Sequence, residues 1–272
     1  MTRQQLFDQI RKKQSYLCIG LDPDINKLPA GVERTARGVF EFLVQVVRAT
    51  SELCVAYKPN LAFFEALGPE GWVVLEQLLE QIPDDCFVIA DAKRGDIGNT
   101  SGLYARAFFE QLDCDAVTVA PYMGHDSVKP FLTKPGKWVV LLALTSNPGS
   151  HDFQLLKLEN GRLVYEEVLL KSQEWATPEQ LMFVVGATRT EHLQRVRELA
   201  PDHFLLVPGV GAQGGSLEEV SRLGMNATCG LLVNASRSIL YASSGPDFAE
   251  AARTEAQYMQ TEMATYLAQY LK

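Results

Sequence analysis

The chain lacks the features that would place it in a membrane or outside the cell. Its N-terminus has no positively charged stretch followed by an apolar run, and no apolar span is long enough to cross a bilayer. The five cysteines are odd in number, widely spaced and without a CxxC pair, a pattern that fits a reducing compartment. These absences predict a cytoplasmic protein that is neither secreted nor inserted in a membrane.

Positive charge and clustered metal ligands are also scarce. The formal net charge is −8, which argues against nucleic acid or an anionic membrane as the main partner. The four histidines form neither an HExxH motif nor a close cluster with cysteine, so we expect no zinc site built by the protein. The cysteines lie mostly in or beside apolar runs and are expected to be buried. An anionic substrate would need a local basic site.

The chain does contain a repeated alternation of short β-rich runs and longer amphipathic segments. In residues 39–47 and 72–79, apolar positions recur at three- and four-residue steps, as they do in helices that pack on a sheet. Between such segments lie apolar runs of the kind that buried parallel strands require. We expect eight strands, at Tyr16–Leu21, Val55–Lys58, Phe87–Asp91, Ala116–Val119, Trp138–Leu144, Met182–Val185, Phe204–Val207 and Leu231–Val233.

Eight short βα units in a chain of 272 residues favour a closed barrel over an open doubly wound sheet. The predicted fold is therefore α/β, a (β/α)8 TIM barrel in a single domain over residues 1–272. We expect an insertion after the fifth strand, at about 147–178, with a helix from Leu163 to Trp175. A last helix near Phe248–Leu271 would close the chain.

Charged residues gather where the first three predicted strands end. In barrels of this kind the active site lies at the C-terminal ends of the strands. Asp22 follows the first strand, Lys58 ends the second, and the third runs into Asp91, Lys93 and Asp96. The strand period of two puts the carboxylate and the amine of the third strand on one face. A lysine buried between carboxylates keeps its proton and can donate it.

A structural alternative is that these residues form salt bridges that seal the top of the barrel, with Asp96 capping the following helix. For one Asp–Lys pair this alternative would be preferred. Five titratable groups at one rim favour a catalytic site instead. Asp24 and Arg94 are weaker candidates for the same site.

A second motif follows the seventh and eighth predicted strands. Residues 207–215 are rich in glycine and lead toward a helix, and Arg237 follows the eighth strand. At this place in a barrel, backbone N–H groups and a helix N-terminus commonly bind a phosphate. Arg237 would supply positive charge and Gln213 a neutral donor. The two motifs together predict a small phosphorylated substrate.

The segment Asp91-Ala-Lys-Arg-Gly-Asp-Ile-Gly-Asn-Thr100 contains the pattern DxKxxDIxxT. This pattern resembles the orotidine 5′-phosphate decarboxylase family. Further matches to the family span the chain: Leu21-Asp22, Lys58, Ser146-Asn-Pro-Gly149, Pro208-Gly-Val-Gly-Ala-Gln-Gly214 and Asn234-Ala-Ser-Arg-Ser-Ile239. The segments Tyr57-Lys-Pro-Asn60 and Thr145-Ser-Asn-Pro-Gly-Ser150, with the long insertion, resemble the longer bacterial subgroup of that family, type 2.

The resemblance implies a decarboxylation that forms uridine 5′-phosphate and carbon dioxide in pyrimidine biosynthesis, without metal or organic cofactor. Lys93 would protonate C6 of the pyrimidine as carbon dioxide leaves. Asp91 would lie near the departing carboxylate, and Lys58 and Asp22 would hold the ribose and support Asp91.

The resemblance also implies the binding residues and the assembly. Ser146 would contact the pyrimidine, and Gln213 and Arg237 would bind the 5′-phosphate. The family is homodimeric, and Asp96 and Thr100 would reach across the interface into the partner's site. No nucleic acid or membrane partner is implied.

Two other functions would share part of this pattern of residues. A metal-dependent decarboxylase or aldolase of the same superfamily would carry an acidic residue near the end of the second strand, where this chain has Lys58. A cation at that point would oppose a divalent ion. A barrel that only binds a nucleotide would need the phosphate site but neither Lys93 nor the carboxylates around it.

Overall fold

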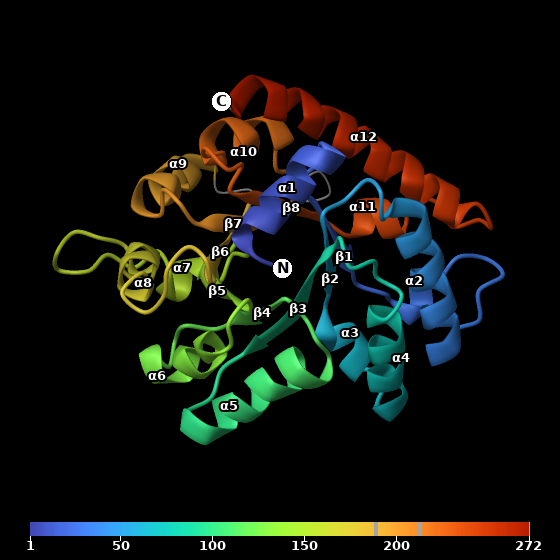
Figure 1. Ribbon diagram of the computed structural model, residues 1–272, viewed down its shortest axis with the longest axis horizontal. Helices are drawn as coiled ribbons and strands as arrows, with labels where there is room; N and C mark the ends of the chain where they lie inside the picture. Colours follow the sequence, from blue (N-terminus) through green and yellow to red (C-terminus); the bar gives the residue numbers. More distant parts are fainter. Residues whose placement is uncertain (188–189, 211–213, 272) are drawn as a thin grey trace.

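The computed structural model describes residues 1–187, 190–210 and 214–271. Eight parallel strands pair in chain order and close into a barrel, with helices around it (Figure 1). This confirms the predicted α/β barrel. The strands are β1 Leu17–Leu21, β2 Ala56–Pro59, β3 Phe87–Arg94, β4 Ala116–Val119, β5 Trp138–Leu144, β6 Leu181–Val185, β7 Phe204–Pro208 and β8 Leu231–Ala235.

The helices follow the strands and pack their apolar faces on the outside of the barrel. Thr35 caps the helix Ala36–Thr50, because its side chain accepts the backbone N–H of Gly38. The α-helices are α1 Arg3–Lys13, α2 Ala36–Thr50, α3 Leu61–Glu65, α4 Pro69–Leu79, α5 Gly98–Arg106, α6 His125–Val128, α7 Ser150–Phe153, α8 Val164–Ser172, α9 Thr190–Leu199, α10 Leu217–Gly224, α11 Arg237–Leu240 and α12 Phe248–Tyr270.

The expected boundaries differ from the observed ones mainly at the ends of elements. β3 continues to Arg94 rather than ending at Asp91, because it pairs again with β4 beyond an irregularity in their register. β8 likewise continues to Ala235, and α8 is shorter than the expected helix from Leu163 to Trp175. Residues 147–178 hold α7, α8 and a short antiparallel bridge between Lys157 and Leu163.

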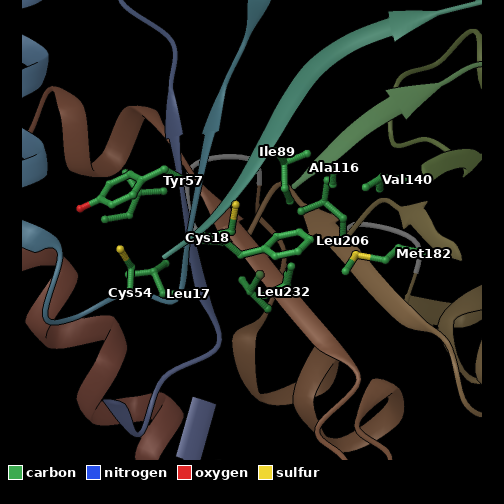
Figure 2. Packing of buried hydrophobic residues seen from close by; sticks show 14 of the residues in the cluster. Leu17, Cys18, Cys54, Tyr57, Ile89, Ala116, Val140, Met182, Leu206 and Leu232 are labelled. Atoms are coloured by element: carbon green, nitrogen blue, oxygen red, sulfur yellow. The ribbon is translucent and has the colours of Figure 1, made fainter. Parts of the chain in front are cut away.

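The barrel interior is filled in layers by alternate residues of the strands. Toward the base, the Trp138 indole packs edge-on against the rings of Phe87 and Phe204. Aliphatic and sulfur-containing side chains fill the middle, among them Cys18 and Leu206 (Figure 2). Among the described residues, the charged side chains of the interior lie in the last layer, at the C-terminal end, above apolar side chains that are almost fully buried.

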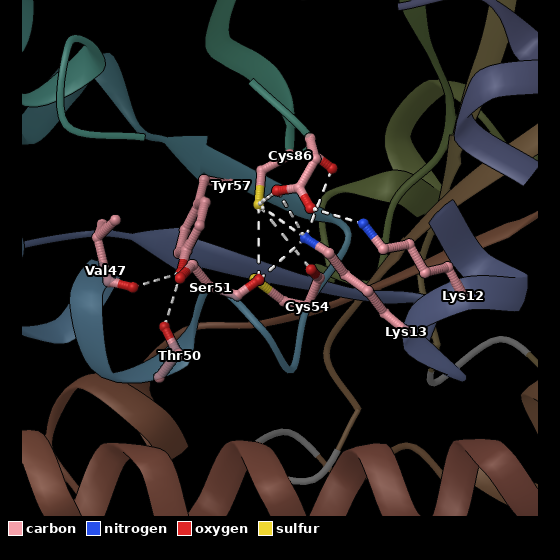
Figure 3. Close-up of polar contacts among 9 residues, drawn as sticks. Lys12, Lys13, Val47, Thr50, Ser51, Cys54, Tyr57 and Cys86 are labelled. Carbon is pink, nitrogen blue, oxygen red and sulfur yellow. Dashed lines mark hydrogen bonds and ion pairs between the residues drawn. The ribbon is translucent and has the colours of Figure 1, made fainter. Parts of the chain in front are cut away.

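Helix α1 lies across the opposite, N-terminal end of the barrel. The Met1 ammonium pairs with Asp115 at the start of β4, and the Met1 carbonyl accepts the Trp138 indole N–H. At the other end of α1, the Lys13 ammonium donates to the Ser51 carbonyl at 3.0 Å and to Asp85 Oδ1 at 3.1 Å (Figure 3). Among the described residues no helix is both long and apolar enough to span a bilayer.

Candidate active site

Lys58, Asp91 and Lys93 form one charged cluster at the C-terminal end of the barrel. The Lys58 ammonium donates to Oδ2 of Asp91 at 2.7 Å, and the Lys93 ammonium contacts Oδ1 at 2.5 Å. The Lys58 side chain is 6% exposed, whereas that of Lys93 is 51% exposed. The Lys58 ammonium is thus enclosed by the barrel, whereas the Lys93 ammonium faces the open mouth.

The predicted shared face of Asp91 and Lys93 is confirmed by this contact, although strict alternation does not produce it. Lys93 has a φ of 48°, in the left-handed region, and the register of β3 against β4 shifts between Ala90 and Arg94. A β-bulge of this kind turns side chains away from the regular pleat. The irregular backbone is therefore what directs the Lys93 amine back onto the carboxylate.

Asp91 is held ionised by its two lysine neighbours. Burial by itself would raise the pKa of this carboxyl, but the charges and hydrogen bonds of Lys58 and Lys93 lower it to about 2. For Lys58, burial acts to lower the pKa, and the charges of Asp91 and Asp22 more than offset it, so that the pKa is raised. Asp91 and Lys58 are therefore both charged at neutral pH.

Asp22 completes the cluster but keeps an unused acceptor. Its Oδ1 lies 4.0 Å from the Lys58 ammonium, an ion-pair distance too long for a hydrogen bond. The same oxygen is buried and has no hydrogen-bond partner in the part of the chain that the structure describes. A buried carboxylate oxygen without a donor is costly. Because the Asp22 side chain is 19% exposed at the mouth, its carboxylate is suited to accept a hydroxyl from a bound molecule.

The described residues on either side of 211–213 in the glycine-rich motif contact one another just after β7. Gly209 has a φ of 98°, and the Gly215 N–H donates to the Gly209 carbonyl at 3.2 Å. A Cβ on Gly215 would lie 2.6 Å from the Ala187 Cβ, so the close approach requires glycine. Gln213 lies outside the described residues, and its role in phosphate binding stays a prediction.

Arg237 lies where the eighth strand gives way to α11, as expected. Its side chain is exposed and forms no ion pair within residues 1–187, 190–210 and 214–271. Nearby, β1 and β8 approach so closely that a Cβ on Gly20 would lie 1.8 Å from Ser236 Oγ. This packing fixes the start of α11 against the mouth of the barrel.

The remaining predicted residues lie around the mouth rather than in the central cluster. Asp96 is half-buried and accepts the N–H of Ile97, and Thr100 is exposed on α5. The alternative in which Asp96 caps this helix is wrong, because Ile97 occupies the N-cap position and α5 begins at Gly98. Ser146 is half-buried just after β5, where a Cβ on Gly186 would lie 2.8 Å from the Ser146 Cβ.

Arg94 and Asp24, the weaker candidates, have structural partners. The Arg94 guanidinium pairs with Glu65 and lies over the rings of Tyr104 and Phe108. Asp24 caps the short 3-10 helix Ile25–Lys27. Both side chains therefore hold the loops around the mouth.

Sequence reasoning missed one residue of the site, Thr118. Its hydroxyl accepts the Lys93 backbone N–H at 2.8 Å and donates to Asp91 Oδ1 at 3.1 Å. The only available signal was a hydroxyl residue within the apolar run of the fourth strand. Within the described ranges, no three His, Cys, Asp or Glu side chains come together as metal ligands would.

The mouth of the barrel carries a lysine–aspartate–lysine cluster, a glycine-rich motif and an arginine. This arrangement is typical of barrel enzymes that act on small phosphorylated molecules. Comparison with known proteins narrows this class. The chain belongs to the orotidine 5′-phosphate decarboxylase / HUMPS family, whose model matches residues 15–254.

Individual relatives agree with this family over nearly the whole chain. A protein of Phocaeicola vulgatus named orotidine 5′-phosphate decarboxylase is 56% identical, covering 99% of this chain and 100% of its own length. A protein of the same name from Parabacteroides distasonis is 58% identical, covering 98% of this chain and 96% of its own. The solved structure of Leishmania donovani OMP decarboxylase has a TM-score of 0.82 at 36% identity, covering 96% of this chain and 99% of that one.

Proposed function

We propose that this chain decarboxylates orotidine 5′-phosphate to uridine 5′-phosphate and carbon dioxide, as a carboxy-lyase of pyrimidine biosynthesis. The observation that carries the proposal is the half-exposed Lys93 ammonium seated on a buried, ionised Asp91. The names of the similar proteins support the same reaction. The five thiols are all unpaired and buried, which supports the reducing cytoplasm as its compartment.

Lys93 is the proposed proton donor. Loss of carbon dioxide leaves the bonding electron pair on C6 of the pyrimidine, and an ammonium beside that carbon stabilises the carbanion and then protonates it. Asp91 holds this ammonium in place and keeps negative charge next to the carboxylate that leaves. Lys58 neutralises the second oxygen of Asp91, so the aspartate does not need a second partner from the substrate.

Other groups at the mouth of the barrel are proposed to bind the rest of the substrate. The Asp22 carboxylate, whose side chain is 19% exposed at the mouth, is a suitable acceptor for a ribose hydroxyl. Ser146 is proposed to contact the pyrimidine, and Arg237 and Gln213 are proposed to bind the 5′-phosphate. Phosphate binding, remote from the broken bond, would supply energy for closing the site.

We also propose that the protein works as a homodimer, with Asp96 and Thr100 completing the partner's site. Large apolar side chains are exposed next to Asp96 and on the segments that follow β4 and β5, which supports an interface on this side of the mouth. Ile97 is 56% exposed, and the rings of Tyr122 and Phe153, 88% and 64% exposed, lie 6.3 Å apart.

The first experiment follows the loss of absorbance as orotidine 5′-phosphate becomes uridine 5′-phosphate, with excess chelator present. Wild type and Lys93→Ala are compared. We expect chelator-resistant turnover by the wild type, and a fall in kcat of about 10²–10⁴-fold or more in the variant, the size of a lost general acid.

Two other results would redirect the proposal. Turnover of a sugar phosphate that stops when magnesium is chelated would move the chain to the metal-dependent members of its superfamily. Nucleotide binding by a folded wild type without any turnover would make it a binding protein.

A further inference from the structure

Thr118 lies opposite the irregular part of β3. The register pairs Ala90 with Val117 and Arg94 with Val119. Four residue steps along β3, from 90 to 94, therefore run beside two steps along β4, from 117 to 119. Residues inside such a bulge lose their regular partners in the sheet. The backbone N–H of Lys93, which lies within the bulge, needs another acceptor.

The Thr118 hydroxyl supplies that acceptor and uses its own proton on the neighbouring carboxylate. It receives the Lys93 N–H at 2.8 Å and donates to Asp91 Oδ1 at 3.1 Å. This is the same oxygen that the Lys93 ammonium contacts at 2.5 Å. A hydroxyl suits the position because it can accept and donate at once. Thr118 is 1% exposed, so water does not readily replace it.

The backbone that this hydroxyl holds is strained. Lys93 has a φ of 48°, a conformation that a residue with a Cβ adopts only when its surroundings impose it. The direction of the Lys93 side chain depends on this conformation. A contact that fixes the backbone of Lys93 and the carboxylate of Asp91 together also fixes where the ammonium lies.

We propose that Thr118 is a positioning residue of this site, whose hydroxyl locks the Lys93 backbone and the Asp91 carboxylate into one arrangement. This inference rests on the proposed role of Lys93 as proton donor. Thr118 itself does not meet the substrate; it acts through the two residues that do.

Valine and serine replacements separate this role from simple packing. Thr118→Val keeps the shape and loses the hydroxyl, whereas Thr118→Ser keeps the hydroxyl and loses a methyl group. We expect kcat to fall roughly ten- to hundredfold in Thr118→Val, the effect of a lost hydrogen bond to a charged group. Thr118→Ser should stay within about threefold of the wild type, since serine can make both hydrogen bonds.

Two readouts accompany kcat. KM for orotidine 5′-phosphate should change little in Thr118→Val, because the groups proposed to bind the phosphate and ribose are untouched. The acidic limb of the pH profile of kcat should move to higher pH, because Asp91 loses a donor that favours its ionised form. Circular dichroism and urea unfolding establish that each variant is folded.

The opposite order, with Thr118→Ser more impaired than Thr118→Val, would show that the methyl group matters and would overturn the proposal. Equal kcat in Thr118→Val and wild type would overturn it too. If the valine variant does not fold, Thr118→Ala against Thr118→Ser gives the same comparison at nearly equal volume. An inactive wild type, or an unimpaired Lys93→Ala, would instead contradict the proposed function, so the two failures are distinguishable.

Discussion

The two ends of the barrel each bury a lysine beside an aspartate, with different outcomes. At the base, the Lys13 side chain is 6% exposed and contacts Asp85, the Ser51 carbonyl and the Cys86 sulfur (Figure 3). At the mouth, Lys58 is equally buried and contacts Asp91. Burial acts to lower the pKa of both lysines and their neighbours raise it overall.

The difference lies in what remains unsatisfied around each lysine. At the base, the Ser51 and Asp85 carbonyls, the Asp85 carboxylate and the Cys86 sulfur accept from the Lys13 ammonium. Among the described residues, no buried polar side-chain atom of this cluster lacks a hydrogen-bond partner. At the mouth, Asp22 keeps a buried oxygen that has no donor among the described residues, and Lys93 extends a second ammonium toward solvent. In barrels the N-terminal face serves stability and the C-terminal face chemistry, and these two clusters follow that division.

The largest expected effect comes from breaking the cluster at the mouth. Lys58→Met leaves Asp91 without its buried partner, so the carboxylate can turn away from Lys93. We expect kcat to fall by about 10³-fold or more, as for loss of a preorganised charge in an active site. Turnover and urea unfolding are measured on the same preparation. A variant that is less stable but retains full kcat would contradict the division between the two ends.

The next effect concerns the proposed phosphate site at the mouth. Arg237→Gln removes charge-assisted hydrogen bonds of about 1.5–3 kcal/mol each. We expect kcat/KM for orotidine 5′-phosphate to fall roughly tenfold to hundredfold or more. Arg222→Gln, an exposed arginine on α10, is the matched control. With orotidine, which lacks the phosphate, wild type and Arg237→Gln should be equally slow; a persistent difference would place Arg237 elsewhere.

A smaller effect, on stability alone, is expected at the base. Lys13→Met removes an ammonium that bonds the Ser51 carbonyl and an aspartate that is itself partly exposed. We expect the free energy of unfolding to fall by about 2 kcal/mol, with kcat unchanged in the folded protein. Lys12→Met is the control, because the Lys12 side chain is 69% exposed. Loss of kcat in Lys13→Met would mean that the base communicates with the mouth.

The last effect, similar in size to that of Lys13→Met, is confined to acid. His203, just before β7, is 3% exposed, and burial followed by the charges of Arg197 and Arg3 lowers its pKa from 6.5 to about 4. On acidification the unfolded chain therefore takes up this proton first, and stability present above pH 6.5 is lost as the pH falls toward 4.

Between pH 7 and pH 5, uptake of this proton by the unfolded chain should lower the free energy of unfolding of the wild type by roughly 2 kcal/mol. His203→Phe keeps the ring contact with Phe183, whose centroid lies 5.1 Å away, and removes the titration. Urea unfolding at the two pH values measures the difference. The same decline in both proteins would assign the acid sensitivity to another group.

Most of the predicted strands are confirmed, because a buried parallel strand produces an apolar run that can be recognised in the local sequence. β4 and β5 have the predicted bounds, since their apolar runs are flanked by clear breaks. The ends of β3 and β8 were predicted too short, because their polar last residues still pair with neighbours. Polar residues at a strand end look like a loop in sequence, although at a barrel mouth they belong to the sheet.

The sequence by itself determined the eight-stranded fold, the gathering of charge at the first three strand ends, and the family pattern from Asp91 to Thr100. Only the tertiary structure decided that Lys58 is buried while Lys93 is exposed, that Asp22 keeps an unused oxygen, and that Thr118 joins the site. The reason is that these properties depend on how neighbouring strands, from β1 to β4, register against one another. Register is a relation between segments, so no single segment encodes it.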